Sequence, residues 1–144
     1  MTYNGHSYKL YNDGMTWEDA KVYCESIGGH LVIITDENEQ IVVENLLYEK
    51  GTKTDYWIGG FKNDRDLWQW VTNETFRYSN LEDEQPDNYN GVEKFIEIYQ
   101  SVGKWNDMPL YANENFGLIC EWDSGGSLMN KSNNLLKNVT FAQN

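Results

Sequence analysis

Apolar residues in the first third of the chain recur at the three- and four-residue spacing of a helix face. The first such stripe consists of Trp17, Ala20, Cys24 and Ile27. Thr16 precedes this stripe as a candidate cap, and the glycine pair at residues 28–29 is expected to end the helix. A second helix is expected to begin at Thr35 or Asp36 and to stop at Gly51. Its apolar face comprises Val42, Val43, Leu46 and Leu47.

Short alternating or apolar runs predict strands around these helices. They lie at residues 3–11, 31–34, 56–61, 67–71, 95–99, 104–107 and 117–122. The last run is expected to pair with the first. Trp68 and Trp70 are interpreted as core residues rather than as a sugar-binding platform, and Trp105 is also expected in the core. Little regular structure is expected between residues 72 and 90, and binding residues commonly concentrate in such a long acidic loop.

Composition narrows the class of protein. A chain of 144 residues is long enough for one domain with its own core. Its formal net charge of −12 argues against nucleic-acid binding, because phosphates would be repelled. There is no apolar run near the ~20 residues that a membrane span needs, and no signal peptide is visible at the start.

Oxygen-bearing side chains near residues 85–107 are the main candidates for chemistry. They are Gln85, Asp87, Glu93, Asn106 and Asp107. Calcium prefers carboxylate and amide oxygens, and without Cys or His a zinc or copper site has little support here. Pro86 favours a turn, and its peptide bond is of the only kind that adopts the cis form cheaply. Taken alone, Gln85-Pro86-Asp87 is also compatible with an ordinary acidic loop.

Two further groups of residues, three acids and two cysteines, can be interpreted in more than one way. Asp36, Glu37 and Glu39 are interpreted as first-turn acids of the second helix rather than as a metal cluster. Cys24 and Cys120 are either a disulfide or two buried free thiols of a cytosolic protein. If bridged, they close a loop of about 97 residues. Chain-entropy arguments give such a disulfide a stabilising effect of roughly 4 to 5 kcal/mol.

Several dispersed motifs together resemble a C-type lectin-like domain over about residues 3 to 122. The motifs are Trp57-Ile58-Gly59-Gly60, Trp68-Gln69-Trp70, Gln85-Pro86-Asp87 and the Cys24/Cys120 pair. The resemblance implies an α+β fold in which two helices flank small antiparallel sheets beside a long calcium-binding loop region. It also favours a Cys24–Cys120 disulfide, an oxidising compartment and hence an extracellular or cell-surface location. We expect the domain to span residues 1–123 and residues 124–144 to form a linker and C-terminal extension.

The resemblance assigns roles to the candidate residues. It implies that Ca²⁺ is held by Gln85, Asp87, Glu93, Asn106 and Asp107. It implies that the sugar-binding residues are Gln85, Asp87, Tyr89, Glu93 and Asn106. Two vicinal hydroxyls would complete the calcium shell. The family associates the Gln-Pro-Asp order with galactose and N-acetylgalactosamine, and the Tyr89 ring could stack on the apolar face of galactose.

The sequence departs from the family pattern at two places. Phe95 and Leu110 stand where many relatives carry a second disulfide, and two apolar side chains can pack there instead. Asn88 and Lys94 stand where a second calcium would need carboxylates, so we expect one calcium ion.

The functional expectation is a calcium-dependent carbohydrate-binding module rather than an enzyme. The histidines lie outside the candidate site, and carboxylates bound to calcium would be poor proton donors. Single-site affinity should be weak, so multivalency or inclusion in a larger protein is expected. The alternative is a protein- or surface-binding module that keeps the fold without sugar recognition.

Overall fold

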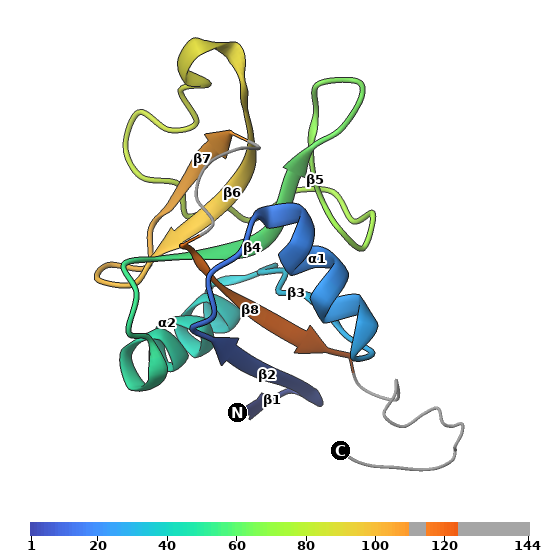
Figure 1. The fold of residues 1–144 in the computed structure, drawn as a ribbon, viewed down its shortest axis with the longest axis vertical. Helices are drawn as coiled ribbons and strands as arrows, with labels where there is room; N and C mark the ends of the chain where they lie inside the picture. Colours follow the sequence, from blue (N-terminus) through green and yellow to red (C-terminus); the bar gives the residue numbers. More distant parts are fainter. Residues whose placement is uncertain (110–114, 124–144) are drawn as a thin grey trace.

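The computed structural model describes residues 1–109 and 115–123, and within them two α-helices pack against a single mixed sheet (Figure 1). The helices are α1 (Trp17–Ser26) and α2 (Glu37–Lys50). The strands are β1 (Thr2–Tyr3), β2 (His6–Tyr11), β3 (His30–Leu31), β4 (Asp55–Lys62), β5 (Trp68–Trp70), β6 (Glu93–Tyr99), β7 (Trp105–Pro109) and β8 (Gly117–Trp122). A short 3₁₀ turn, η1, covers Tyr89–Gly91. The α+β expectation is confirmed.

The sheet differs from the several small antiparallel sheets that we expected. Its strands follow the order β1-β2-β8-β4-β6-β7, with β3 paired to β8 and β5 paired to β4. The described strands therefore form one hydrogen-bonded sheet, in which β4 and β8 run parallel. The parallel pair arises because β8, the last strand, inserts between β2 and β4 after a long excursion of the chain.

The N-terminal strand is interrupted where one continuous strand was expected. Asn4 and Gly5 have positive φ values of 51° and 84°, a conformation that Asn and Gly adopt most readily. They form the turn between β1 and β2. The predicted pairing of the first and last strands is confirmed, with Ser7 opposite Trp122 and Tyr11 opposite Leu118.

Both helix starts are as expected. The Thr16 hydroxyl accepts a hydrogen bond from the Asp19 amide at 3.2 Å, and the Asp36 carboxylate accepts one from the Glu39 amide at 2.8 Å. These caps satisfy amides that have no partner inside the helix. The burial of Ile27 was predicted wrongly, because α1 already ends at Ser26 and Ile27 is 39% exposed.

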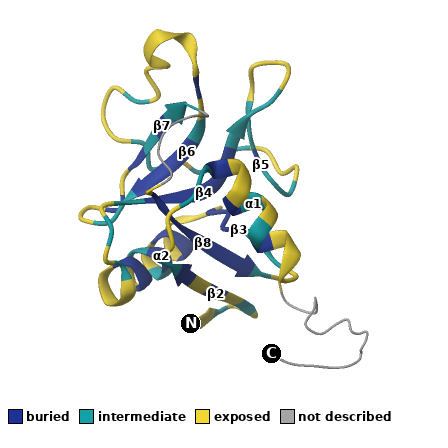
Figure 2. Ribbon diagram, viewed as in Figure 1, coloured by how far each residue is buried: buried dark blue, intermediate teal, exposed yellow. Residues whose placement is uncertain are grey.

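Aromatic residues and a disulfide hold the core together. Trp57, Trp70 and Trp105 are fully buried, and β4 and β8 are the most continuously buried strands in Figure 2. Trp68 is only half-buried, with the Lys62 ammonium 5.1 Å from its ring centre. The expected Cys24–Cys120 disulfide is present and ties α1 to β8.

The loops beyond one end of β6 and β7 are largely exposed and contain the candidate site (Figures 1 and 2). Trp105, at the start of β7, connects this region to the core, because its indole NH donates to the Gln40 side-chain oxygen at 3.1 Å. No helix in the described part of the chain is both long and apolar enough to span a bilayer.

Candidate calcium site

Three carboxylates converge where the long loop meets β6 and β7. Oxygens of Asp87, Glu93 and Asp107 all lie within 4.8 Å of one another. Asp87 is in the exposed loop, whereas Glu93 opens β6 and Asp107 lies inside β7, both buried. Asp107 thus lies in the strand predicted at residues 104–107, whereas Glu93 belongs to β6 because that strand begins before its predicted start at residue 95. Two strands thus hold two of the three carboxylates, and the loop brings the third to them.

Backbone amides of the loop bond to the two buried carboxylates. Asp107 accepts from the Asp87 amide at 3.3 Å and from the Asn88 amide at 2.9 Å. Glu93 accepts from the Tyr89 amide at 3.0 Å, and its own amide donates to the Asn88 side chain at 3.1 Å. These contacts fix the loop against the strand ends, and carboxylate lone pairs remain for a cation.

The loop reaches this position through unusual backbone conformations. The Gln85–Pro86 bond is cis. Asn88, Asn90 and Gly91 have φ values of 49°, 59° and 71°, which only Gly, Asn and Asp adopt easily. The turn over residues 88–91 returns the chain to Glu93.

The site carries uncompensated negative charge. Burial, followed by the nearby Asp87 and Asp107 carboxylates, raises the pKa of Glu93 to about 7, although the Tyr89 amide opposes the shift. Within residues 1–109 and 115–123, no Lys or Arg forms an ion pair with any of the three acids. A cation bound here would relieve their repulsion.

The two amide candidates have other partners. The Gln85 side-chain oxygen accepts from the Asp87 amide at 3.1 Å. The Asn106 side chain donates to Glu97 at 3.1 Å, and its buried oxygen has no hydrogen-bond partner in the described part of the chain. Adjacent strand residues point to opposite faces, which separates Asn106 from Asp107. The structure thus brings three of the five candidates together, and the complete ligand set remains a prediction.

Glu97 is a residue near the site that we had not singled out. It lies opposite Asn106 in the β6–β7 pair and is 1% exposed. Burial, reinforced by the Asp55 carboxylate, raises the pKa of Glu97 to about 9. The sequence signal for Glu97 was weak. Glu97 stands between two isoleucines in an alternating strand, and an acid in that place is usually interpreted as a surface residue.

The remaining candidates have simple environments. Tyr89 is 68% exposed in η1, so its ring is accessible from solvent. Phe95 packs on Trp17 with ring centres 4.5 Å apart, which agrees with apolar packing where relatives carry a disulfide. Leu110 and the expected extension at residues 124–144 lie outside the described residues.

Comparisons of the sequence and of the structure with known proteins point to the same family. The profile of the Lectin C-type domain matches residues 13–122. A perlucin-like protein of Mytilus galloprovincialis is 35% identical over 123 residues, covering 82% of this chain and 77% of the relative. The C-type lectin CRL of Crotalus ruber ruber is 30% identical over 126 residues, covering 83% and 93%. The crystal structure of the C-type lectin CEL-I from Cucumaria echinata superposes with a TM-score of 0.74 at 26% identity, covering 83% and 91%.

These matches confirm the C-type lectin fold. Proteins of this family typically bind carbohydrate, generally use Ca²⁺ and are usually secreted or displayed at the cell surface. They are binding proteins, which confirms the expectation that the chain is not an enzyme. With a family profile matched over most of its length, the chain belongs to the C-type lectin domain family.

Proposed function

We propose that this chain is a calcium-dependent carbohydrate-binding module that recognises galactose-type sugars. The observation that carries the proposal is the convergence of Asp87, Glu93 and Asp107 without a cationic partner among the described residues. Such a cluster suits a hard divalent cation.

The residues present fit calcium by their chemistry. All five proposed ligands offer oxygen: the carboxylates of Asp87, Glu93 and Asp107, and the amides of Gln85 and Asn106. The buried Asn106 oxygen has no hydrogen-bond partner among the described residues, and it would gain a cation as its partner if the side chain left Glu97 and turned to the ion. When bound, calcium would supply direct coordination of two vicinal sugar hydroxyls.

The side chains would determine which hydroxyls fit. Carboxylates accept hydrogen bonds and amides donate them. With Gln85 before the cis bond and Asp87 after it, donor and acceptor are ordered for galactose-type sugars, in the pattern that the family associates with them. Tyr89 is exposed and would offer its face to the C–H side of the sugar.

Binding of galactose and N-acetylgalactosamine with and without a calcium chelator tests this function. We expect one equivalent of calcium per chain, and sugar binding around millimolar that disappears in chelator. Binding that persists in chelator would contradict the proposal, as would a chain that takes up no calcium. A chain that binds calcium but no glycan would instead support the protein-binding alternative.

Exchanging Gln85→Glu together with Asp87→Asn is expected to shift preference from galactose towards mannose. The change reverses donor and acceptor around the cis bond while leaving net charge unchanged. Competition by the two monosaccharides against an immobilised glycan measures the shift. Calcium affinity is the control and should change little. Unaltered galactose preference in a variant that still binds calcium would refute the hydroxyl-pairing mechanism.

Calcium is expected to raise the melting temperature by several degrees, and by more at about pH 8 than at about pH 5.5. The pKa of Glu93 is raised to about 7. The Glu93 carboxyl has a higher pKa in the folded chain than in the unfolded chain, so the folded chain binds more protons. The calcium-free fold therefore loses stability as pH rises from about 4.5 to 7. Calcium removes that loss above pH 7, whereas at pH 5.5 it has to displace a proton. Calorimetry at both pH values measures the two increments, and equal increments would contradict this role of Glu93.

The proposed setting is extracellular or at the cell surface, with the sugar-binding unit repeated or joined to other domains. The disulfide supports an oxidising compartment. A weak single site supports multivalent use. Sedimentation of the full chain, compared with its binding to dense and sparse glycan surfaces, tests the multivalent part.

A further inference from the structure

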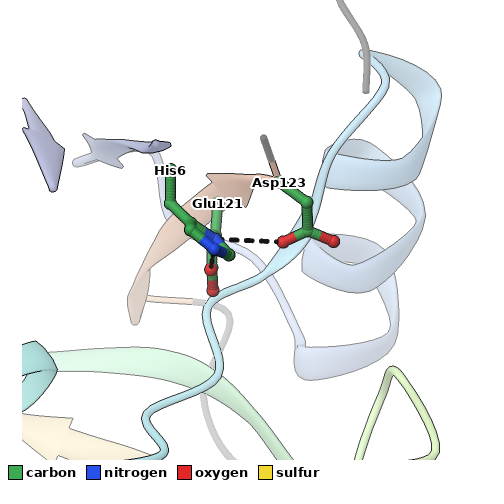
Figure 3. A group of neighbouring side chains, drawn as sticks. All are labelled: His6, Glu121 and Asp123. Atoms are coloured by element: carbon green, nitrogen blue, oxygen red, sulfur yellow. Dashed lines mark hydrogen bonds and ion pairs between the residues drawn. The ribbon is translucent and has the colours of Figure 1, made fainter. Parts of the chain in front are cut away.

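A second group of metal-ligating side chains gathers away from the calcium candidates, where the β1–β2 hairpin meets the end of β8. His6 opens β2, Glu121 lies near the end of β8, and Asp123 follows that strand. The His6 Nδ1 atom is 2.7 Å from Glu121 Oε2 and 3.3 Å from Asp123 Oδ1. Figure 3 shows the imidazole of His6 lying against both carboxylates. The group shares no residue with the proposed calcium site.

We propose that His6, Glu121 and Asp123 form a binding site for a zinc ion. One ligand atom from each of the three lies within 4.8 Å of the other two. Zinc accepts imidazole nitrogen and carboxylate oxygen at about 2.0 to 2.2 Å, so tetrahedral ligand pairs are separated by roughly 3.3 to 3.5 Å. The two distances from His6 Nδ1 therefore need to open by less than about 1 Å for an ion to enter. The imidazole ligand favours zinc over calcium, which takes oxygen.

Neighbouring groups orient the ligands as outer-shell partners do in zinc sites. The Ile33 amide donates to Glu121 Oε1 at 3.0 Å, which leaves Oε2 directed at His6. His30 Nε2 lies 3.0 Å from Asp123 Oδ1, and its Nδ1 lies 2.7 Å from the Leu31 carbonyl. The Leu31 carbonyl of β3 holds the His30 ring on one side, and the ring in turn holds Asp123 at the end of β8. His30 is thus a positioning residue for Asp123.

The cavity beside these ligands is suited to a cation. Its volume is about 350 Å³, which leaves room for water to complete the shell. Its lining includes five carboxylates, those of Asp36, Glu39, Glu74, Glu121 and Asp123. No Lys or Arg is present among the described residues that line it. An ion also has a path to the site, because the His6 and Asp123 side chains are 31% and 53% exposed.

Titration of the full 144-residue chain with zinc chloride tests the site. The protein must carry no polyhistidine tag, and excess calcium keeps the calcium candidates occupied. We expect one equivalent of zinc. His6→Gln and Asp123→Asn should each weaken zinc binding by at least about 10-fold, because loss of an outer-shell partner alone typically costs about 10- to 100-fold. Both positions are partly exposed, so the variants should fold, as their zinc-free melting temperatures will show.

Asp66→Asn is the matched control for loss of one negative charge. Asp66 lies in the β4–β5 connection, its side chain is 75% exposed, and its positive φ of 66° suits Asn. Its zinc affinity should equal that of the unaltered chain. Zinc binding that is unchanged by His6→Gln would overturn the proposal, as would an equal loss in all three variants. X-ray absorption at the zinc edge should show imidazole nitrogen together with oxygen, and an all-oxygen shell would also overturn it.

Discussion

Replacing Asp107 with asparagine is expected to weaken calcium binding by about 100-fold and to abolish calcium-dependent sugar binding. Asp107 is buried in β7, within 4.8 Å of both Asp87 and Glu93. Its ionised carboxylate would supply a full negative charge at a position that the strand fixes. Calcium affinity depends strongly on ligand charge and on the rigidity of the site, and Asp107 provides both.

The same replacement should loosen the loop even without calcium. Both Asp107 oxygens accept loop amides, one from Asp87 and one from Asn88. In asparagine, one of these acceptors becomes an NH₂ donor that faces another donor. We therefore expect faster hydrogen exchange at the Asn88 amide, while the core amides of β4 and β8 keep their protection.

The matched control is Asp83→Asn, which removes one charge from the exposed part of the same acidic loop. Its calcium affinity should change by no more than about 2-fold, because exposed charges are well screened. Calorimetric titration of both variants measures the difference. If Asp107→Asn bound calcium as tightly as Asp83→Asn, the convergence of carboxylates would have no bearing on calcium, and the sugar-binding proposal would lose its main support.

Local chemistry made the helices and the buried aromatic residues predictable. Thr16 and Asp36 cap their helices through hydrogen bonds that span only three residues, so the pattern is contained within a short segment. Trp70 and Trp105 were predictable core residues because each lies in a strand-like run and few positions in a small domain can hold an indole. Pairing of Cys24 with Cys120 depended on resemblance, since two cysteines alone left free thiols possible.

Side-chain direction at the candidate site was less predictable. Asn106 and Asp107 are adjacent in the chain, and the resemblance placed both of them around one calcium ion. Their position inside β7 instead sends them to opposite faces, one beside Glu97 and one beside Asp87. The extension of β7 to Pro109 depends on its pairing with β6. Such pairing is a long-range property that the local sequence does not contain.

Convergence over long separations was predictable only in part. His6 and Glu121 are 115 residues apart, and only the pairing of β2 with β8 brings them to 2.7 Å. The predicted pairing of the first and last strands implied proximity of this kind. However, the register that sets His6 beside Asp123 depends on the Asn4–Gly5 turn, which we had included within a continuous strand.

Removing the disulfide by Cys24→Ala with Cys120→Ala is expected to lower the free energy of unfolding by about 4 to 5 kcal/mol. The two cysteines are 96 positions apart, so the bridge restricts most of the unfolded domain. Small domains have total stabilities of about 5 to 15 kcal/mol, so this loss would leave the calcium-free chain close to unfolding. Denaturant titration in chelator measures the change. Thiol reduction of the unaltered chain is the control, because it removes the bond and leaves the cysteines in place.

Calcium should partly restore the fold of this double variant. An ion that binds only the folded state adds about 2.7 kcal/mol at a concentration 100 times its dissociation constant. The proposed ligands lie in the β6–β7 region, whereas the disulfide ties α1 to β8, so the two effects should be nearly additive. Equal denaturant midpoints for the variant and the unaltered chain would contradict the entropic role of the bridge. If the bridge contributes as expected but calcium fails to raise the variant's midpoint, the ion does not bind the folded state in the way proposed for Asp87, Glu93 and Asp107.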